Sequence, residues 1–399
     1  MLKKIFATIG TRYVIALFNL ALIFVNARVL GIEGVGLVGL IVASMNLIMI
    51  FNGILSGNTL VYFMHRYSMR AVVRLAYLWV PFGSFLASGC LAAIGLLPAG
   101  YELSIALLAL LNSYVNANAR FLLGKDDIAG FNLTFALQGG LLFFVLMALY
   151  FGLGWSAVGA YVAGFFLTNG IAWAVSAYRL WPYFREDKSE TQSIGTLRLL
   201  REMFAYGLWA GADNLAENCT TRLNYFLIER FGGLGSVGLL DAGTKIAESV
   251  WHISRSVSFI AYGEVAKRTE AASQRQITRR LLGLTALALL LVMGAILCVP
   301  EWVYTEWLFG ESFVGIRRVI VGLSVGIVTL GCNSVLSHYF IGSGRIRWSA
   351  ASSAVGLITL LLAGSLLIPC YGVIGSAWTT SIAFTAMLLF SLIVFRVQK

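Results

Sequence analysis

The sequence predicts an all-α polytopic membrane protein with about twelve transmembrane helices in two six-helix lobes. Of its 399 residues, 59% are hydrophobic and only 12% are charged. A water-soluble chain of this length cannot bury that much apolar surface in one or two cores. Roughly twelve crossings of about 20 residues each would use most of the chain, which leaves no room for a sizeable soluble domain.

Apolar stretches of spanning length predict the individual helices in chain order. The first six lie at 8–28, 37–60, 75–97, 103–122, 130–150 and 157–178. A polar break from Arg179 to Glu202 follows them. The second six lie at 203–228, 238–260, 280–299, 314–340, 347–368 and 373–395. Polar residues near Ser113, Thr220 and Lys245 interrupt the runs, so hydropathy alone defines those helix ends poorly.

The basic residues orient these helices. With Lys3 and Lys4 placed inside, most later Lys and Arg residues fall in loops on the same side, and four fall on the other: Arg28, Arg230, Arg317 and Arg318. By the positive-inside rule, both termini are predicted to be cytoplasmic, as an even helix count requires. Because the basic residues are scattered among loops, the net charge of +11 predicts no nucleic-acid partner.

No targeting segment, catalytic group, cofactor or metal is predicted. The first apolar run is longer than a signal-peptide core and contains Arg12, Asn19 and Asn26, so we expect an uncleaved helix. The chain has no Gly-x-x-x-x-Gly-Lys-Ser/Thr phosphate loop for a nucleotide. Its cysteines lie in apolar segments without metal-ligand spacing, at Cys90, Cys219, Cys298, Cys332 and Cys370.

A short segment after the first predicted helix recurs after the seventh. Residues 28–37 (RVLGIEGVGL) match residues 230–239 (RFGGLGSVGL) at an offset of 202, which also superposes Pro98 on Pro300 and the basic pair at 65–66 on 267–268. Both copies start on the same side of the membrane. The halves are therefore predicted to be related by a pseudo-two-fold axis along the membrane normal, as lobes 1–180 and 203–399 joined by a cytoplasmic linker, 181–202.

The same segment carries a family resemblance. Residues 29–37 (VLGIEGVGL) resemble the Leu-Gly-Pro-x-Gly-x-Gly-Leu element of polysaccharide exporters, with Ile32 in place of the usual proline. The basic loop after the second helix, residues 300–310 (PEWVYTEWLFG) and residues 371–376 (YGVIGS) are similar to the Wzx-type O-antigen flippases. These flippases belong to the multidrug/oligosaccharidyl-lipid/polysaccharide exporter superfamily, and the resemblance spans nearly the whole chain.

The resemblance implies a fold and a function. The implied fold has two six-helix lobes around a central cavity bordered by helices 1, 2, 7 and 8, and it works by alternating access. The implied function is to move an undecaprenyl-pyrophosphate-linked oligosaccharide across the bacterial inner membrane. The expected partners are membrane lipids and the polysaccharide polymerase and ligase that would use the transported product.

Ionisable residues at membrane depth point to the same helices. Such a group costs about 2.5 to 3.5 kcal/mol on insertion scales, so its presence indicates function. They occur in the first, seventh and eighth predicted helices: Arg12; Asp213, Glu217 and Arg222; and Lys245, Glu248, His252 and Arg255. The spacing of three, four and three residues in the eighth helix places its four groups along one stripe.

We assign two roles to these groups. Arginine suits a pyrophosphate because its planar guanidinium donates paired hydrogen bonds to phosphate oxygens. The predicted substrate-binding residues are Arg12, Asn19, Asn26, Arg222, Lys245, Trp251, His252 and Arg255. Buried carboxylates can exchange a proton or bind a cation. The predicted ion-coupling residues are Asp213, Glu217 and Glu248.

Structural pairing is the alternative for each acidic residue. Glu248 is within reach of Lys245 and His252 on its own helix, and Asp213 or Glu217 could neutralise Arg222. On function, a lipid-linked oligosaccharide flippase is predicted, and the alternatives are a cation-coupled multidrug antiporter of the same superfamily or a membrane-bound polysaccharide polymerase or glycosyltransferase. The antiporter would favour buried carboxylates in the amino-terminal lobe, and the enzyme would need a large external loop; the sequence has neither.

Overall fold

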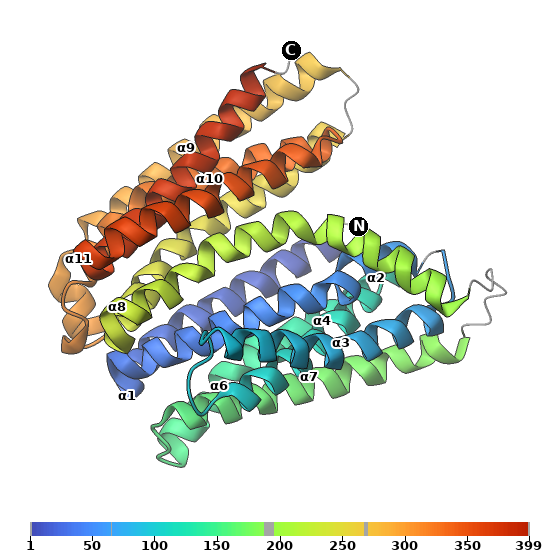
Figure 1. Cartoon of the computed structure of the whole chain (residues 1–399), viewed down its shortest axis with the longest axis horizontal. Coiled ribbons are helices and arrows are strands. Elements are labelled where there is room, and N and C mark those ends of the chain that lie inside the picture. The colour runs from blue at the N-terminus through green and yellow to red at the C-terminus, as the bar shows by residue number, and fades with distance from the viewer. Residues whose placement is uncertain (1, 65, 187–194, 267–269, 398–399) are drawn as a thin grey trace. The chain divides into compact units, whose positions relative to one another are not determined.

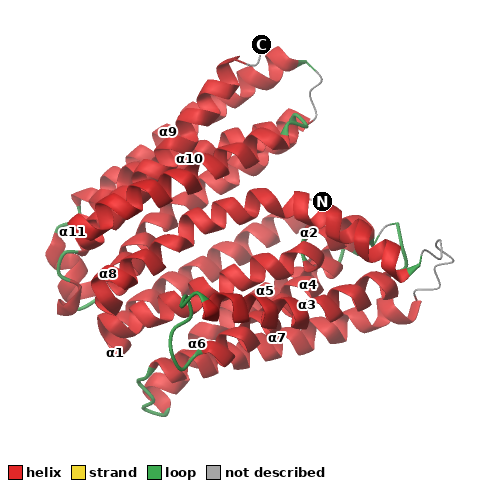
Figure 2. Ribbon diagram, viewed as in Figure 1, coloured by secondary structure: helices red, strands yellow, loops and turns green. Residues whose placement is uncertain are grey.

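The computed structural model describes residues 2–64, 66–186, 195–266 and 270–397. Within these ranges the side chains of 2–13, 58, 209–217, 221 and several positions between 252 and 271 are outside the description. The described residues are helical almost throughout, and no strand is found among them (Figure 2). The prediction of an all-α protein is confirmed.

The chain divides into two compact units. Unit 1 comprises residues 1–22 and 40–212, and unit 2 comprises residues 23–39 and 213–399. The short segment 23–39 therefore packs with the carboxy-terminal helices although it belongs to the first helix of the chain. The predicted lobes, 1–180 and 203–399, remain a prediction.

In unit 1, antiparallel helices pack around α4, which contacts α3 on one side and α7 on the other (Figure 1). The elements wholly in unit 1 are α2 (Asn58–Phe63), α3 (Met69–Ala93), α4 (Glu102–Gly124), α5 (Ile128–Phe135), α6 (Leu141–Met147) and α7 (Val158–Glu186). Two π-helical segments, η1 (Ala136–Gly140) and η2 (Ala148–Gly152), make residues 128–152 into one rod with α5 and α6.

In unit 2, α10 packs against both α9 and α11 (Figure 1). The elements wholly in unit 2 are α9 (Ala271–Cys298), η3 (Val303–Leu308), η4 (Glu311–Phe313), α10 (Ile316–Gly342) and α11 (Ile346–Val397). Two long helices contribute to both units: α1 (Leu2–Ser56) and α8 (Thr196–Ala266).

All twelve predicted spans fall on described helices. Three of the helices bend at a single non-helical glycine and supply two spans each: α1 at Gly31, α8 at Gly233 and α11 at Gly372. In α11 the bend follows Pro369, which removes a helical hydrogen bond from the preceding turn. The chain is a multi-pass membrane protein with the predicted twelve-helix architecture.

Hydropathy and length alone identify only some of the twelve spans. Among the described residues, seven helical segments are long and apolar enough to cross a membrane, and neither α4 nor α8 is among them. Polar residues lower the hydropathy of both helices. Those in α4 are Asn112, Asn116 and Asn118, and those in α8 include Arg222, Asp241 and Glu248. The helices that hydropathy misses are therefore the ones with the densest polar content.

The bends in α1 and α8 share one backbone conformation. Gly31 has φ 67° and ψ −178°, and Gly233, which lies 202 residues later, has φ 68° and ψ −176°. Positive φ at these positions favours glycine, because a Cβ would be strained there. This is the offset at which the two sequence segments match, so the predicted internal repeat is confirmed at the bends.

A second pair of glycines marks where the two repeated segments cross. A Cβ on Gly36 would overlap the backbone carbonyl oxygen of Leu234, and a Cβ on Gly238 would overlap that of Ile32. The offset of 202 residues relates Gly36 to Gly238 and Ile32 to Leu234. The contact is therefore reciprocal, as a local two-fold axis requires. Small residues allow such close backbone approach between membrane helices.

A polar contact in unit 1 joins the chain before α3 to the start of α8. The Tyr67 hydroxyl donates to Glu202 Oε2 at 2.8 Å, and Arg198 Nε donates to Glu202 Oε1 at 3.1 Å. The hydrogen bond from Tyr67, together with that from Arg198, lowers the pKa of the Glu202 carboxyl. The same bond raises the pKa of the Tyr67 hydroxyl.

This contact predicts a pH dependence. Because the pKa of Glu202 is lower in the folded than in the unfolded chain, its contribution is present above the ordinary carboxyl pKa and is lost as the pH falls below about 4. We expect Glu202→Gln to flatten the acid limb of the melting temperature plotted against pH in detergent. Glu102→Gln, at an exposed position of unit 1, is the matched control. Identical acid limbs for wild type and Glu202→Gln would contradict this role.

Candidate substrate-binding site

The bend at Gly233 brings polar residues of the two arms of α8 together in unit 2. Arg222 and Tyr225 lie on the first arm, and Asp241, Lys245 and Glu248 lie on the second. The chain reverses direction between the arms, so residues 26 apart in sequence can meet at the same depth. We call these five residues the α8 cluster.

The most buried acid of the α8 cluster is Asp241, at 2% exposure. Its Oδ2 lies 2.6 Å from Lys245 Nζ, and its Oδ1 accepts a hydrogen bond of 3.2 Å from the Tyr225 hydroxyl. Asp241 is not among the residues predicted from the sequence. The available signal was that it precedes Lys245 by four residues within a predicted span, the spacing of a helical ion pair.

Room for the Asp241 carboxylate comes from the repeated segment. A Cβ on Gly39 would lie 3.2 Å from Asp241 Cγ, so the glycine faces the carboxylate directly. Gly39 and Asp241 are also equivalent positions at the offset of 202. One copy of the repeat therefore carries the charge, and the other provides the space that it occupies.

Arg222 is held more loosely than Lys245. Its Nη2 lies 3.9 Å from Glu248 Oε2, near the limit of an ion pair, and its guanidinium carbon lies 5.8 Å from the centre of the Tyr225 ring. Among the described residues, no group accepts a hydrogen bond from Arg222 Nε. Arg222 is therefore less completely paired than Lys245, which has a carboxylate at short distance.

One pairing considered from sequence differs from the ion pairs of the described residues, whereas those with His252, Asp213 and Glu217 lie outside the described side chains. Glu248 pairs with Arg222 across the bend of α8, and not with Lys245 on its own arm. Lys245 instead pairs with Asp241. Sequence spacing within one helix could not reveal the Arg222–Glu248 contact, because it depends on the two arms folding against each other.

There is little free volume on the inner side of the α8 cluster. A cavity of about 10 Å³ is lined by Tyr225, Thr244 and Glu248 together with residues of α10 and α11, which is room for about one water molecule. The side chains of Arg222, Glu248 and Lys245 are 22%, 23% and 29% exposed. A ligand would thus meet the cluster at a partly exposed edge formed by these two cations and Glu248.

The structure describes the side chains of only some of the other predicted site residues. The side chains of Arg12, Asp213, Glu217, His252 and Arg255 lie outside the described residues, although their backbone positions fall in α1 and α8. Asn26 is buried, and Asn19, about two turns earlier in α1, is exposed. Trp251 packs against an apolar cluster of Leu330, Phe384 and Met387, so core packing accounts for much of its position.

Unit 1 contains a separate network of buried and partly buried amides. Asn112 Oδ1 accepts hydrogen bonds from Asn116 at 2.7 Å and from Gln138 at 2.9 Å, and Gln138 also donates to Asn169 Oδ1 at 3.0 Å. Gln138 lies in the π-helical segment η1, a local widening that often occurs at functional positions. These amides satisfy one another, so the unit 1 network has no ionisable group, whereas the described α8 cluster contains two cations and two carboxylates whose formal charges cancel.

A protein family matches this chain over its middle portion. The sequence profile of the family described as "Polysaccharide biosynthesis protein" matches residues 103–318, more than half of the chain. An uncharacterized membrane protein of Methanocaldococcus jannaschii is 22% identical over 217 residues. That match covers 54% of this chain and 42% of the archaeal protein, so the region of similarity spans less than half of that relative.

Two solved transporter structures resemble the whole chain in fold. One is a multidrug resistance MATE family transporter of the MOP superfamily in an inward-facing conformation, with a TM-score of 0.71, 14% identity, and coverage of 96% of this chain and 94% of the other. The second is the lipid II flippase MurJ in an inward closed conformation, with a TM-score of 0.75, 12% identity, and coverage of 100% and 88%. At these identities the similarity establishes the fold.

The predicted twelve-helix exporter fold is thereby confirmed. The bends at equivalent glycines and the crossing of their segments agree with an architecture built from two repeated halves. Together with the profile match over residues 103–318, these findings place the chain in the polysaccharide biosynthesis protein family, with the fold of the MOP-superfamily transporters.

Proposed function

We propose that this protein is a flippase that moves an undecaprenyl-pyrophosphate-linked oligosaccharide from the cytoplasmic to the outer leaflet of the bacterial inner membrane by alternating access. The observation that carries the proposal is the family membership combined with an incompletely paired arginine at membrane depth, Arg222. A pyrophosphate headgroup is what prevents such a lipid from crossing unaided. A partly desolvated guanidinium is a suitable group to bind it.

Within this proposal the residues of the α8 cluster have different roles. Arg222 contacts the pyrophosphate, and Lys245 contributes positive potential while its pair with Asp241 offsets the cost of burying both charges. Arg12, His252 and Arg255 are proposed to extend the cationic surface, and Asn19, Asn26 and Trp251 to contact sugar hydroxyls and ring faces. A polysaccharide polymerase and a ligase are the proposed users of the flipped product.

Ion coupling is proposed to depend on the carboxylates at Asp213, Glu217 and Glu248. Asp213→Asn and Glu217→Gln are expected to weaken the dependence of transport on an imposed proton or sodium gradient several-fold, because an amide neither titrates nor carries charge. The measurement is transport in proteoliposomes with and without each gradient. Unchanged gradient dependence in both variants would remove these residues from the coupling mechanism.

A binding comparison tests the proposed cargo against the antiporter alternative. The full chain in detergent is titrated with undecaprenyl pyrophosphate, undecaprenyl monophosphate and a lipophilic cation, and binding is followed by microscale thermophoresis. We expect undecaprenyl pyrophosphate to bind at least about tenfold more tightly than the cation. The pyrophosphate can make a charge-assisted contact with Arg222 that the cation cannot make, and such a contact contributes about 1.5 to 3 kcal/mol. Tighter binding of the cation would favour the antiporter and overturn the proposal.

A further inference from the structure

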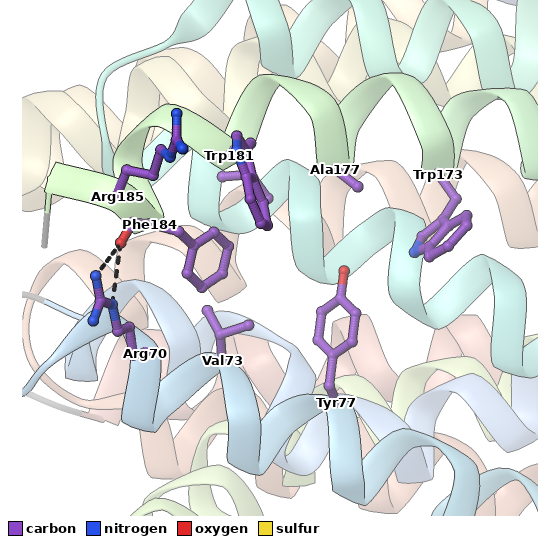
Figure 3. Close-up of a pocket in the computed structure, with 9 residues that line it drawn as sticks. Arg70, Val73, Tyr77, Trp173, Ala177, Trp181, Phe184 and Arg185 are labelled. Atoms are coloured by element: carbon purple, nitrogen blue, oxygen red, sulfur yellow. Dashed lines mark hydrogen bonds between the residues drawn. The ribbon is translucent and has the colours of Figure 1, made fainter.

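A groove of about 440 Å³ lies between α3 and α7 in unit 1, and it shares no lining residue with the α8 cluster (Figure 3). Its volume is within the range of small-molecule sites. Two arginines contribute to its lining, Arg70 from α3 and Arg185 from α7, and most of the remaining wall is apolar or aromatic. Neither the fold nor the proposed transport site requires such a groove.

Both arginines belong to the same end of the groove. The guanidinium of Arg70 donates from Nε and Nη2 to the carbonyl oxygen of Phe184, at 3.1 and 2.8 Å, as the dashed lines in Figure 3 show. Arg70 lies in the first turn of α3 and Arg185 in the last turn of α7, so the two helices are antiparallel here. This end is the one that the positive-inside rule predicts to be cytoplasmic.

Aromatic side chains continue the groove from this cationic end toward the middle of α7. Trp181 and Trp173 precede Arg185 by four and twelve residues, which corresponds to about 6 and about 18 Å along a helix. Trp181 is 60% exposed and Trp173 is 38% exposed. In a membrane helix, exposed aromatic surface of this kind faces lipid.

The order of these groups matches one kind of occupant. A phospholipid has an anionic headgroup at the membrane surface and acyl chains that extend about 15 Å into the hydrocarbon. Arginines at the predicted surface, followed inward by tryptophans along an open groove, complement this arrangement in both charge and depth. A soluble anion would gain nothing from the aromatic part, and a lipid without net charge would gain little from the arginines.

We propose that the α3–α7 groove is a binding site for an anionic phospholipid of the cytoplasmic leaflet. Its phosphate lies beside Arg70 and Arg185, and one acyl chain lies along Trp181 and Trp173. The bound lipid bridges the end of α7 to the start of α3. This site is distinct from the transport site, and its existence does not depend on the identity of the cargo.

Tryptophan quenching by brominated lipids tests the proposal. The full chain is reconstituted in phosphatidylcholine vesicles that contain about a tenth of phosphatidylglycerol brominated on its acyl chains, or the same fraction of brominated phosphatidylcholine. We expect stronger quenching by the anionic lipid, and loss of this excess in the Trp173→Phe/Trp181→Phe variant. Equal quenching by the two brominated lipids would overturn the proposal.

Arginine variants identify the headgroup contact. Arg185→Gln should require about fivefold more brominated phosphatidylglycerol for half of the excess quenching, given the usual contribution of one basic residue near an anionic surface. Arg70→Lys keeps the charge but loses the paired guanidinium donors, so its half-point should lie between those of the wild type and Arg185→Gln. Arg74→Gln is the matched control, because Arg74 is an exposed arginine one turn along α3 that does not line the groove. An effect of Arg74→Gln equal to that of Arg185→Gln would contradict a defined site.

Two competition arms distinguish other occupants. Inorganic pyrophosphate added to the vesicles should not reduce the excess quenching, and its complete loss would assign the groove to a soluble anion. Unbrominated undecaprenyl pyrophosphate should compete no better than unbrominated phosphatidylglycerol. Competition at a tenfold lower fraction would assign the groove to the transported lipid and overturn a separate phospholipid site.

Discussion

Gly36→Ala is expected to lower both the amount of folded protein in the membrane and its melting temperature. The added methyl group would overlap the carbonyl oxygen of Leu234, which is backbone and cannot rotate away. Forcing extra atoms into a well-packed contact costs about 1 to 3 kcal/mol, and a backbone neighbour places this change at the upper end. Since α1 and α8 cross here within unit 2, the whole crossing must open. The measurement is membrane abundance together with the melting temperature of purified protein.

The repeat provides both a replicate and a control for this experiment. Gly238→Ala should have an effect similar to that of Gly36→Ala, because it meets the carbonyl oxygen of Ile32 in the reciprocal contact. Gly53→Ala, in the same helix as Gly36, adds a methyl group to open space and should raise stability by up to about 1 kcal/mol through helix propensity. A normal melting temperature for both Gly36→Ala and Gly238→Ala would rule out the close crossing.

Arg222→Gln is expected to reduce transport about 10- to 100-fold while the protein still accumulates. This range corresponds to loss of one charge-assisted contact of about 1.5 to 3 kcal/mol with a phosphate group. Arg222→Lys should retain part of the activity, because an ammonium supplies charge without the planar pair of donors. Arg230→Gln, at an exposed position on the same arm of α8, is the control and should transport at the wild-type rate. Export of a lipid-linked oligosaccharide in a deletion strain measures all three.

A double variant separates cargo binding from structural pairing. If Arg222 serves only to neutralise Glu248, which lies 3.9 Å away, then Arg222→Gln combined with Glu248→Gln should bind undecaprenyl pyrophosphate as tightly as the wild type does. If Arg222 contacts the cargo, the double variant binds it as weakly as Arg222→Gln. Binding is measured here because Glu248→Gln alone is expected to impair ion-coupled transport. Wild-type affinity in the double variant would therefore remove Arg222 from the substrate-binding residues.

Much of the fold could be predicted because it depends on properties that are local in sequence. Apolar runs located all twelve spans, and the match between residues 28–37 and 230–239 anticipated two equivalent bends. What could not be predicted was the path of the chain within those spans. The sequence predicts a turn between helices at 29–37, and in the structure two helices do meet in this segment, but the turn is reduced to a single glycine at positive φ, Gly31, without a loop.

The charged residues of the site were only partly predictable. Arg222, Lys245 and Glu248 stand out by their charge within apolar runs, so the sequence identified them. Their partners depend on the fold of α8 at Gly233, which pairs Arg222 with Glu248 across two arms. Asp241 was missed since it sits only three residues inside a predicted span, where a charge looks like part of the helix end. Its burial follows from packing against Gly39, a contact between repeats.

Direct observation of lipid flipping tests the central claim. The purified full chain is reconstituted in vesicles with undecaprenyl pyrophosphate that carries a fluorescent sugar, and dithionite added outside bleaches only the outer leaflet. We predict that the wild-type protein makes the inner-leaflet pool accessible at a rate well above protein-free vesicles, and that Arg222→Gln lowers this rate at least about tenfold. Equal bleaching kinetics with and without the wild-type protein, under every imposed ion gradient, would contradict the account.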